Sequence, residues 1–264
     1  MIGAIFGDIV GSVYEFDNIK TKQFDLFSRE CNYTDDTVMS IAVAHALLSF
    51  DKVTDTDAFK KKLIALMHAY GHAYMDAGYG GGFYLWLKQR RTKPYGSYGN
   101  GSAMRVSPVG WYAESLEEAL SLAKATAEIT HDHPEGIKGA VVTAGAVYLA
   151  RTGATMAEIK AFVERYYDMG FTLDEIRPVY GFDPSCQGTV PQAMQAFLES
   201  TSFEDAIRNG VSIGGDSDTL CAICGAVAEA YYGMTPREVE AAMAYLDQPL
   251  AAIACRFFDK FATY

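Results

Sequence analysis

Hydrophobic positions along this chain repeat mainly at helical spacing. Ile41, Ala44 and Leu48 recur at intervals of three or four residues, which places them on one face of a helix. Alternating strand patterns are nearly absent, so the sequence predicts an all-α fold. Periodicity and capping signals predict further helices over residues 115–129, 135–151, 155–167, 187–199, 203–209, 218–232, 236–245 and 249–261.

The breaks between these helical runs are short. Glycine-rich stretches at 78–82 and 96–101 fall between helices and are typical of loops rather than of domain boundaries. Residues 168–186 lack a clear period and predict a loop with a short helix. With no short-period repeat and no low-complexity linker, we expect one compact domain over residues 1–264.

The first residues predict a helix with one face of glycine. Gly3, Gly7 and Gly11 recur every four residues, so this helix should approach a neighbour closely. We interpret Asp8 as a buried, hydrogen-bonded structural acid. Glu15 lies where the helix should end, and it is either an exposed loop acid or an acid that approaches a ligand.

Composition narrows the function classes. The net charge of −11 disfavours binding of nucleic acid through a broad basic surface, but not a pocket for one phosphorylated ligand. No apolar run reaches membrane-spanning length, and the N-terminus lacks the basic region of a signal peptide. Five scattered cysteines argue against a disulfide framework, so we expect a cytoplasmic protein. The one C-x-x-C pair, Cys221 and Cys224, we interpret as small core residues.

Two acidic motifs carry the strongest chemical signal. Residues 33–37 read YTDDT and residues 214–219 read GGDSDT, and an alanine-rich helical run follows each motif. Asp and Thr favour helix N-caps, so each motif alone is also compatible with capping. If the fold brings the two together, however, their carboxylates would repel unless a hard cation such as Mg²⁺ or Mn²⁺ bound them. The pair therefore favours a metal site.

Three other stretches are candidates for ligand contact. Residues 78–83 (GYGGGF) form a glycine-rich loop whose backbone could approach a ligand closely. Residues 98–105 (YGNGSAMR) precede an apparent helix. Backbone N–H groups there could bind phosphate, with Asn100 and Ser102 adding side-chain hydrogen bonds, or the stretch could be a capped tight turn. In the sequence H-D-H at 131–133 we favour His131 as a ligand-contacting residue over a metal ligand, and His133 as structural.

In this order, the segments resemble the ADP-ribosylglycohydrolase family. The matching pieces are Asp8 with Glu15, YTDDT, the loop around Gly80, the stretch that ends at Arg105, His131 with its preceding threonine, and GGDSDT. The resemblance covers nearly the whole chain, and the paired acidic motifs are its specific part.

The resemblance implies an orthogonal helical bundle with two Mg²⁺ or Mn²⁺ ions in a cleft. The implied metal ligands are Thr34, Asp35, Asp36, Asp216, Asp218 and Thr219. The implied ADP-ribose contacts are Gly80, Gly99, Asn100, Gly101, Ser102, Ala103, Met104 and His131. As general acid or base we nominate Glu15, Asp36 and Asp216, with Glu15 on a loop that covers the metals.

The activity implied is hydrolysis of the N- or O-glycosidic bond at ribose C1″ of an ADP-ribosylated protein or small molecule, which releases ADP-ribose. One alternative is a non-catalytic ADP-ribose binder or structural protein on the same fold. Another is a lyase or synthase with acidic motifs on an all-α fold, which the compact D-x-D-T motif fits poorly.

Overall fold

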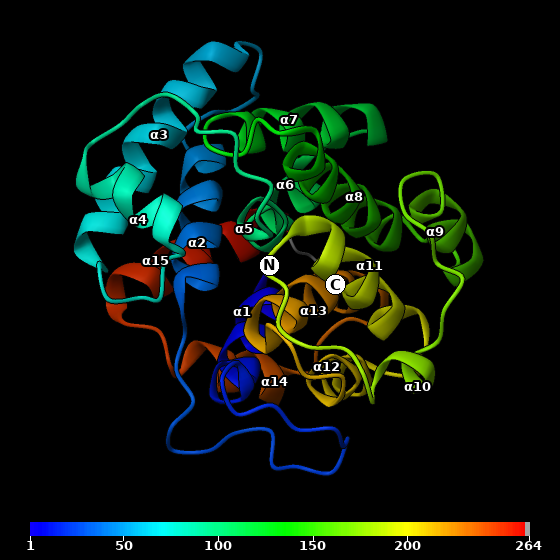
Figure 1. Cartoon of the computed structure of the whole chain (residues 1–264). Coiled ribbons are helices and arrows are strands. Elements are labelled where there is room, and N and C mark those ends of the chain that lie inside the picture. The colour runs from blue at the N-terminus through cyan, green and yellow to red at the C-terminus, as the bar shows by residue number, and fades with distance from the viewer. Residues whose placement is uncertain (262–264) are drawn as a thin grey trace.

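The computed structural model describes residues 1–261, and helices make up its regular structure (Figure 1). No strand occurs among these residues, and Gly99 and Ser185 form an isolated antiparallel bridge. The elements are α1 (Ile2–Gly11), η1 (Ser12–Tyr14), α2 (Asp35–Leu48), α3 (Thr56–Ala73), α4 (Gly81–Lys88), α5 (Gly101–Met104), α6 (Ser107–Tyr112), α7 (Leu116–Glu128), α8 (Pro134–Arg151), α9 (Met156–Val163), α10 (Leu173–Ile176), α11 (Cys186–Leu198), α12 (Phe203–Ser212), α13 (Ser217–Tyr232), α14 (Pro236–Met243) and α15 (Gln248–Phe261).

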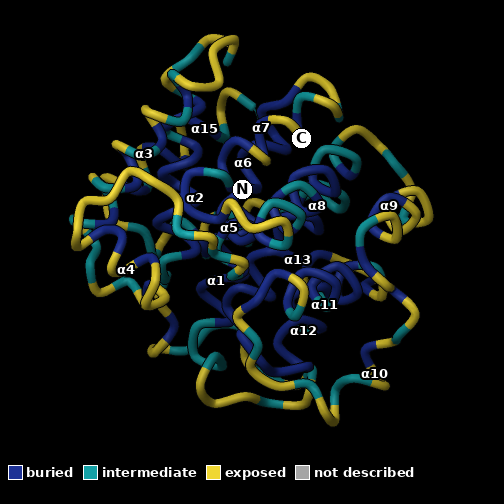
Figure 2. The backbone as a smooth tube through the Cα atoms, turned by 45° about the horizontal axis from the view of Figure 1, so that its top comes forward, coloured by how far each residue is buried: buried dark blue, intermediate teal, exposed yellow. Residues whose placement is uncertain are grey.

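Two helices from opposite ends of the sequence form the centre of the fold. All ten residues of α1 are buried, and so is α13 from Ser217 to Glu229 (Figure 2). A helix that is buried all round can be apolar on every face, as both of these helices largely are. The other helices surround this pair, with α2 and α3 on one side and α8, α11 and α12 on the other (Figure 1).

The glycine face predicted for the first helix is the contact between α1 and α13. A Cβ atom at Gly7 would lie 2.0 Å from the carbonyl oxygen of Cys221, and one at Gly3 would lie 2.3 Å from that of Gly225. Backbone atoms of the two helices therefore meet where any side chain would collide. This contact brings the residues around Asp8 directly beside the start of α13.

Most of the predicted helices are confirmed, and the differences have local causes. The prediction for 155–167 was too long, since α9 ends at Val163 and the chain turns there. The loop predicted at 78–82 was too long, because Gly81 and Gly82 form the first turn of α4. Glycine costs helix stability chiefly inside a helix, whereas Gly80 is a suitable N-cap. Within the predicted 168–186 loop, α10 is the expected short helix.

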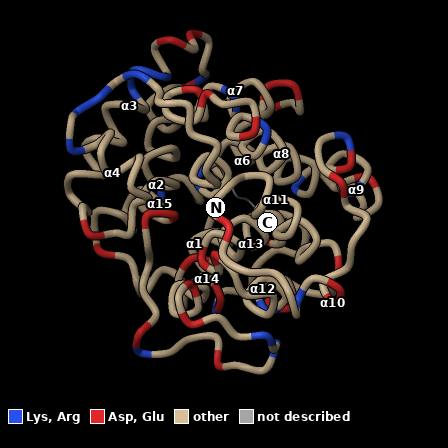
Figure 3. The backbone as a smooth tube through the Cα atoms, viewed as in Figure 1, with Lys and Arg blue, Asp and Glu red and all other residues tan. Residues whose placement is uncertain are grey.

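The positions of charged residues and of the C-x-x-C cysteines agree with the expectations from composition. Lys and Arg lie mainly toward the periphery of the view in Figure 3, whereas Asp and Glu also occur near its centre beside α1. No helix in the described chain has both the length and the apolar character needed to cross a membrane. The two C-x-x-C thiols are fully buried in α13, as expected for core residues.

Candidate metal centre and ligand cleft

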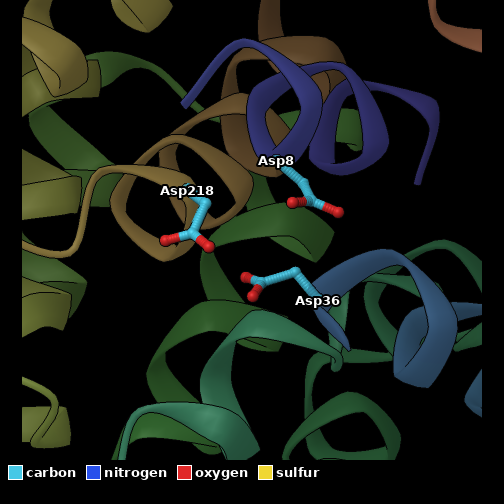
Figure 4. A group of neighbouring side chains, drawn as sticks. All are labelled: Asp8, Asp36 and Asp218. Carbon is cyan, nitrogen blue, oxygen red and sulfur yellow. The ribbon is translucent and has the colours of Figure 1, made fainter. Parts of the chain in front are cut away.

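Three helices bring three buried carboxylates together. Asp8 comes from α1, Asp36 from the first turn of α2 and Asp218 from the first turn of α13, and their side chains point toward one another (Figure 4). One oxygen from each lies within 4.8 Å of one oxygen from each of the others. The two acidic motifs predicted to meet therefore do meet.

A second group shares Asp218 with the first. Glu15, Asp216 and Asp218 also offer oxygens within 4.8 Å of one another. Glu15 follows η1, where the first helical segment ends, and it is half-buried. Asp216 is held by Asn100, whose Nδ2 donates to Asp216 Oδ2 at 2.7 Å. The loop at 98–101 is thus tied to the acidic cluster.

The turn that carries Asp216 depends on glycine and on the segment after α1. Gly214 and Gly215 have φ of +70° and +82°, values that side chains disfavour. Asn18 exchanges two hydrogen bonds with Gly215, accepting from its N–H at 2.7 Å and donating to its carbonyl oxygen at 2.9 Å. The segment that carries Glu15 and the GGDSDT turn are therefore joined.

Asp8 is both a structural acid and a member of the cluster. Its carboxylate accepts hydrogen bonds from the N–H groups of Thr34 and Thr37, at 2.9 Å and 3.1 Å, and from both threonine hydroxyls. These bonds fix the start of α2, as expected for a buried structural acid. The proposed metal ligands did not include Asp8. Its place next to Gly7 was a signal only of a close helix contact, and it did not identify the partner helix.

Crowding and burial shift the acids of the cluster toward their neutral forms. Burial raises the pKa of Asp8 to about 6, against the opposing effect of the threonine hydrogen bonds. Burial, followed by repulsion from Asp216 and Asp8, raises the pKa of Glu15 to about 7. The pKa values of Asp35, Asp36 and Asp218 are also raised, by burial first and neighbouring carboxylates second.

Helix capping explains only part of these motifs. Thr34 is the N-cap of α2, and its hydroxyl accepts a hydrogen bond from Asp36 N–H. Asp216 is the N-cap residue of α13 but makes no side-chain cap bond. Capping therefore accounts for Thr34 in the first motif and leaves the aspartates of both motifs without that role.

The donor set fits a hard divalent cation. Asp36 Oδ1 is buried and accepts no hydrogen bond from the described residues, although a buried carboxylate oxygen normally has a partner. Thr219 Oγ1 lies 3.3 Å from Asp36 Oδ2, so hydroxyl oxygens join the carboxylates. Mg²⁺ and Mn²⁺ prefer such oxygen ligands. Asp35 is half-buried, belongs to neither close group and lines the adjoining cleft.

A cleft of about 460 Å³ opens beside the acidic cluster. Its walls include the cluster acids Asp36 and Asp218, the glycines of the first turn of α4, and the loop from Tyr98 to Gly101. A volume in this range accommodates a small organic ligand. The cleft thus joins the acidic motifs to both glycine-rich loops that sequence reasoning singled out.

The predicted ligand-binding residues do not all face this cleft. Gly80, Gly99, Asn100, Gly101, Met104 and His131 line it. Ser102 is fully buried and its hydroxyl donates to the Gly136 carbonyl oxygen at 2.6 Å, while Ala103 is buried in the core. Any contact of Ser102 with a ligand would use its N–H group, which the four-residue helix α5 cannot bond internally.

The two histidines of the H-D-H stretch lie in different surroundings. His133 is the N-cap of α8, and its Nδ1 accepts from Glu135 N–H at 3.1 Å. His131 is 4% exposed, and its ring lies beside the glycine loop, with Nε2 3.2 Å from the position of a Cβ at Gly101. Neither histidine belongs to a close acidic group among the described residues.

Sequence reasoning missed two aromatic residues of the cleft. Phe182 lines it while 53% exposed, and its ring stacks 6.4 Å from that of Phe16, the residue after Glu15. Tyr95 lines it beside His131, with ring centroids 6.1 Å apart. Aromatic residues in irregular segments carry no periodic signal, so only the fold identifies them.

Comparison with known proteins agrees with this geometry. The family model described as ADP-ribosylglycohydrolase matches residues 1–262. The chain belongs to the ADP-ribosylglycohydrolase family. The resemblance drawn from the two acidic motifs is therefore confirmed, as is the all-α fold class.

Relatives and solved structures cover most of the chain. The ADP-ribosylhydrolase ARH3 of Homo sapiens is 25% identical, over 89% of this chain and 84% of its own. The ADP-ribosylarginine hydrolase Tri1 of Pseudomonas putida is 25% identical, over 98% of this chain and 77% of its own. A solved ADP-ribosylglycohydrolase-related protein complex has the same fold, with a TM-score of 0.69 at 22% identity, over 98% of this chain and 96% of that chain.

Proposed function

We propose that this protein is a metal-dependent hydrolase that cleaves the N- or O-glycosidic bond at ribose C1″ of ADP-ribosylated acceptors and releases ADP-ribose. The observation that carries the proposal is that two close groups of carboxylates adjoin a cleft lined by glycine loops. Family membership and the names of the ARH3 and Tri1 relatives support the same substrate class.

In this proposal the residues predicted from sequence would hold two Mg²⁺ ions, or Mn²⁺ in their place. Asp8 would position one of these residues. The ligand set is Thr34, Asp35, Asp36, Asp216, Asp218 and Thr219. Bound divalent ions supply Lewis acidity and offset the mutual repulsion of the carboxylates. Asp8 orients Thr34 through its hydrogen bonds to the N–H and hydroxyl of that residue.

The reaction requires a proton to leave the attacking water and another to reach the leaving group. The water oxygen bonds to C1″ as the bond from C1″ to the acceptor nitrogen or oxygen breaks. Glu15 is suited to this proton transfer by its place, because its carboxylate lines the cleft and lies close to those of Asp216 and Asp218. Asp36 and Asp216 are the other candidates, and nearby carboxylates favour the positive charge that develops at C1″.

The remaining residues would bind the ADP-ribose portion. Gly80, Gly99 and Gly101 allow backbone to approach the ligand, and Asn100 links that loop to Asp216. His131 and Met104 complete this wall of the cleft. We further propose a cytoplasmic location and a single domain over residues 1–264, of which 262–264 lie outside the described residues.

The alternative is a protein that binds ADP-ribose, or serves structurally, without catalysis. A binder needs no buried carboxylate cluster at the end of its cleft, so the clustering of Glu15 with Asp216 and Asp218 favours the hydrolase. Release of ADP-ribose from an ADP-ribosylated protein or peptide, measured with and without Mg²⁺, separates the two.

Calorimetric titration of ADP-ribose is the direct test of the site. We expect binding that depends on Mg²⁺ or Mn²⁺ and that is lost in the Asp35→Ala/Asp218→Ala variant. Absence of binding to the wild type under every metal condition would overturn the proposal.

A further inference from the structure

One wall of the cleft contains a chain of hydrogen bonds that ends at the ligand side. Arg105 is 1% exposed, and its guanidinium donates to Thr130 Oγ1 at 2.9 Å and to the Thr126 carbonyl oxygen at 3.2 Å. Thr130 is fully buried, and its Oγ1 lies 2.7 Å from His131 Nδ1. The side chains of Arg105, Thr130 and His131 thus form a chain of hydrogen bonds from the core to the cleft, which we call the relay.

The direction of these bonds follows from counting hydrogens. A guanidinium can only donate, so Thr130 Oγ1 is the acceptor toward Arg105. The threonine hydroxyl hydrogen then needs an acceptor of its own, and among the described contacts His131 Nδ1 is the atom that offers one. If Nδ1 carried the hydrogen instead, the buried hydroxyl would be left without an acceptor, which is costly. His131 Nδ1 is therefore unprotonated, and Nε2 carries the ring hydrogen.

The Nε2 atom faces the ligand side of the wall. It lies 3.2 Å and 3.7 Å from where Cβ atoms would stand at Gly101 and Gly99, so that loop leaves room there because it has no side chains. His131 lines the cleft with these glycines. Burial, and then the Arg105 charge, hold the pKa of His131 well below its usual value, so the ring is neutral and presents one N–H group.

We propose that Arg105 and Thr130 are positioning residues that hold His131 as its neutral Nε2–H tautomer, so that it donates a hydrogen bond to an acceptor oxygen of the bound nucleotide. The identity of that ligand rests on the proposed function. The tautomer itself does not, because it follows from the relay alone. A histidine held only by packing would not need a defined tautomer.

Nuclear magnetic resonance tests the tautomer directly. In protein labelled with ¹⁵N at histidine, the His131 signals are assigned by their loss in His131→Gln. In the wild type at pH 7.5 we expect a pyridine-like shift at Nδ1 and a pyrrole-like shift at Nε2. Thr130→Val should allow exchange with the Nδ1–H tautomer and so move the two shifts toward each other, and Thr130→Ser, which retains the hydroxyl, should restore the wild-type values. A protonated Nδ1 in the wild type, or an unchanged pattern in Thr130→Val, would overturn the relay.

Titration of ADP-ribose tests the consequence. Loss of one well-placed donor should raise Kd about two- to tenfold in Thr130→Val, with Thr130→Ser restoring it and Mg²⁺ affinity unchanged. Should Thr130→Val not fold, the pair His131→Gln and His131→Asn serves instead. Gln can place an amide donor near the Nε2 position, whereas Asn cannot reach it, so Gln should bind more tightly.

The outcomes distinguish this inference from the proposed function. Equal ADP-ribose affinity in wild type and Thr130→Val, or tighter binding by His131→Asn than by His131→Gln, would overturn the donor role while leaving the hydrolase proposal in place. If the wild type binds no ADP-ribose, the proposed function fails, and the NMR pattern still decides whether the relay exists.

Discussion

At the scale of single residues, the acids of the cluster lower the stability of the fold while they serve the proposed function. Asp36 is 2% exposed, is close to two other buried carboxylates, and keeps one oxygen without a hydrogen bond among the described residues. A buried charge without a partner destabilises the folded state. The residues we propose to bind metal therefore cost stability whenever no cation is bound.

Asp36→Asn should separate these two effects. Because the amide is neutral, chelator-treated protein at pH 8 should gain roughly 1–3 kcal/mol of unfolding free energy, with a higher Tm. Turnover should fall about 100-fold or more, since a proposed metal ligand and proton-transfer group is lost. Thermal melts with a chelator and an ADP-ribose release assay measure the two quantities.

The matched control is Asp259→Asn, which changes an exposed acid on α15. It should leave both Tm and turnover near the wild-type values. Near-normal turnover in Asp36→Asn would contradict the role given to that residue.

The residues of the two motifs were predictable because their chemistry is local. Thr34, Asp36 and Asp218 each stand in a short run of oxygen donors at a helix start. Asp8 was predictable only as a buried acid, because its neighbours in the cluster come from two other helices. Phe182 was not predictable as a cleft residue, since its place depends on how the loop before α11 folds.

At the scale of elements, the glycine contact between α1 and α13 positions the cluster. The two helices lie side by side with backbone against backbone, and they carry Asp8 and Asp218 (Figures 1 and 4). The four-residue glycine period predicted a close helix contact without naming the partner. Periodicity reports which face of a helix is small, and it carries no information on which distant segment covers that face.

Gly7→Ala should disrupt the fold and the site together. The new Cβ would lie 2.0 Å from the Cys221 carbonyl oxygen, and backbone cannot move aside as a flexible side chain can. We expect a loss of about 3 kcal/mol or more in the free energy of unfolding, with weaker Mn²⁺ binding because Asp8 shifts away from Asp218. Chemical denaturation and Mn²⁺ titration provide the measurements.

Gly181→Ala is the control for that substitution. No atom lies within 4 Å of its added Cβ, so its stability should stay within about 0.5 kcal/mol of the wild type. If Gly7→Ala is equally harmless, the close contact of α1 with α13 is wrong.

At the scale of the whole molecule, the raised pKa values predict how stability depends on pH. The folded protein binds more protons than the unfolded chain between the ordinary and the raised pKa values, which are 3.8 and about 6 for Asp8, and 4.5 and about 7 for Glu15. The stability from these groups is therefore fully present below about pH 4 and is lost as pH rises toward 7. Other groups in the chain titrate as well, so the comparison with metal isolates this effect.

Thermal melts from pH 5 to pH 8, with a chelator or with Mg²⁺, test this prediction. Metal binding to these acids releases protons, so Mg²⁺ should raise Tm more at pH 8 than at pH 5. An equal rise at both pH values would contradict the cluster as the site of binding. Asp259→Asn should show the wild-type difference.

The way in which the cluster joins distant parts of the chain also bears on synthesis. Thr34 and Asp218 are 184 positions apart, yet their side chains lie 3.5 Å from each other. A growing polypeptide emerges from the ribosome with its N-terminal acids first, long before the helix that completes their site. Until then Asp8 and Asp36 remain on a partial fold, where water can solvate them and the carboxylate of Asp218 is absent. Under the proposed function, metal capture would thus wait until α13 has been synthesised, and a product that ends before α13 would be left without it.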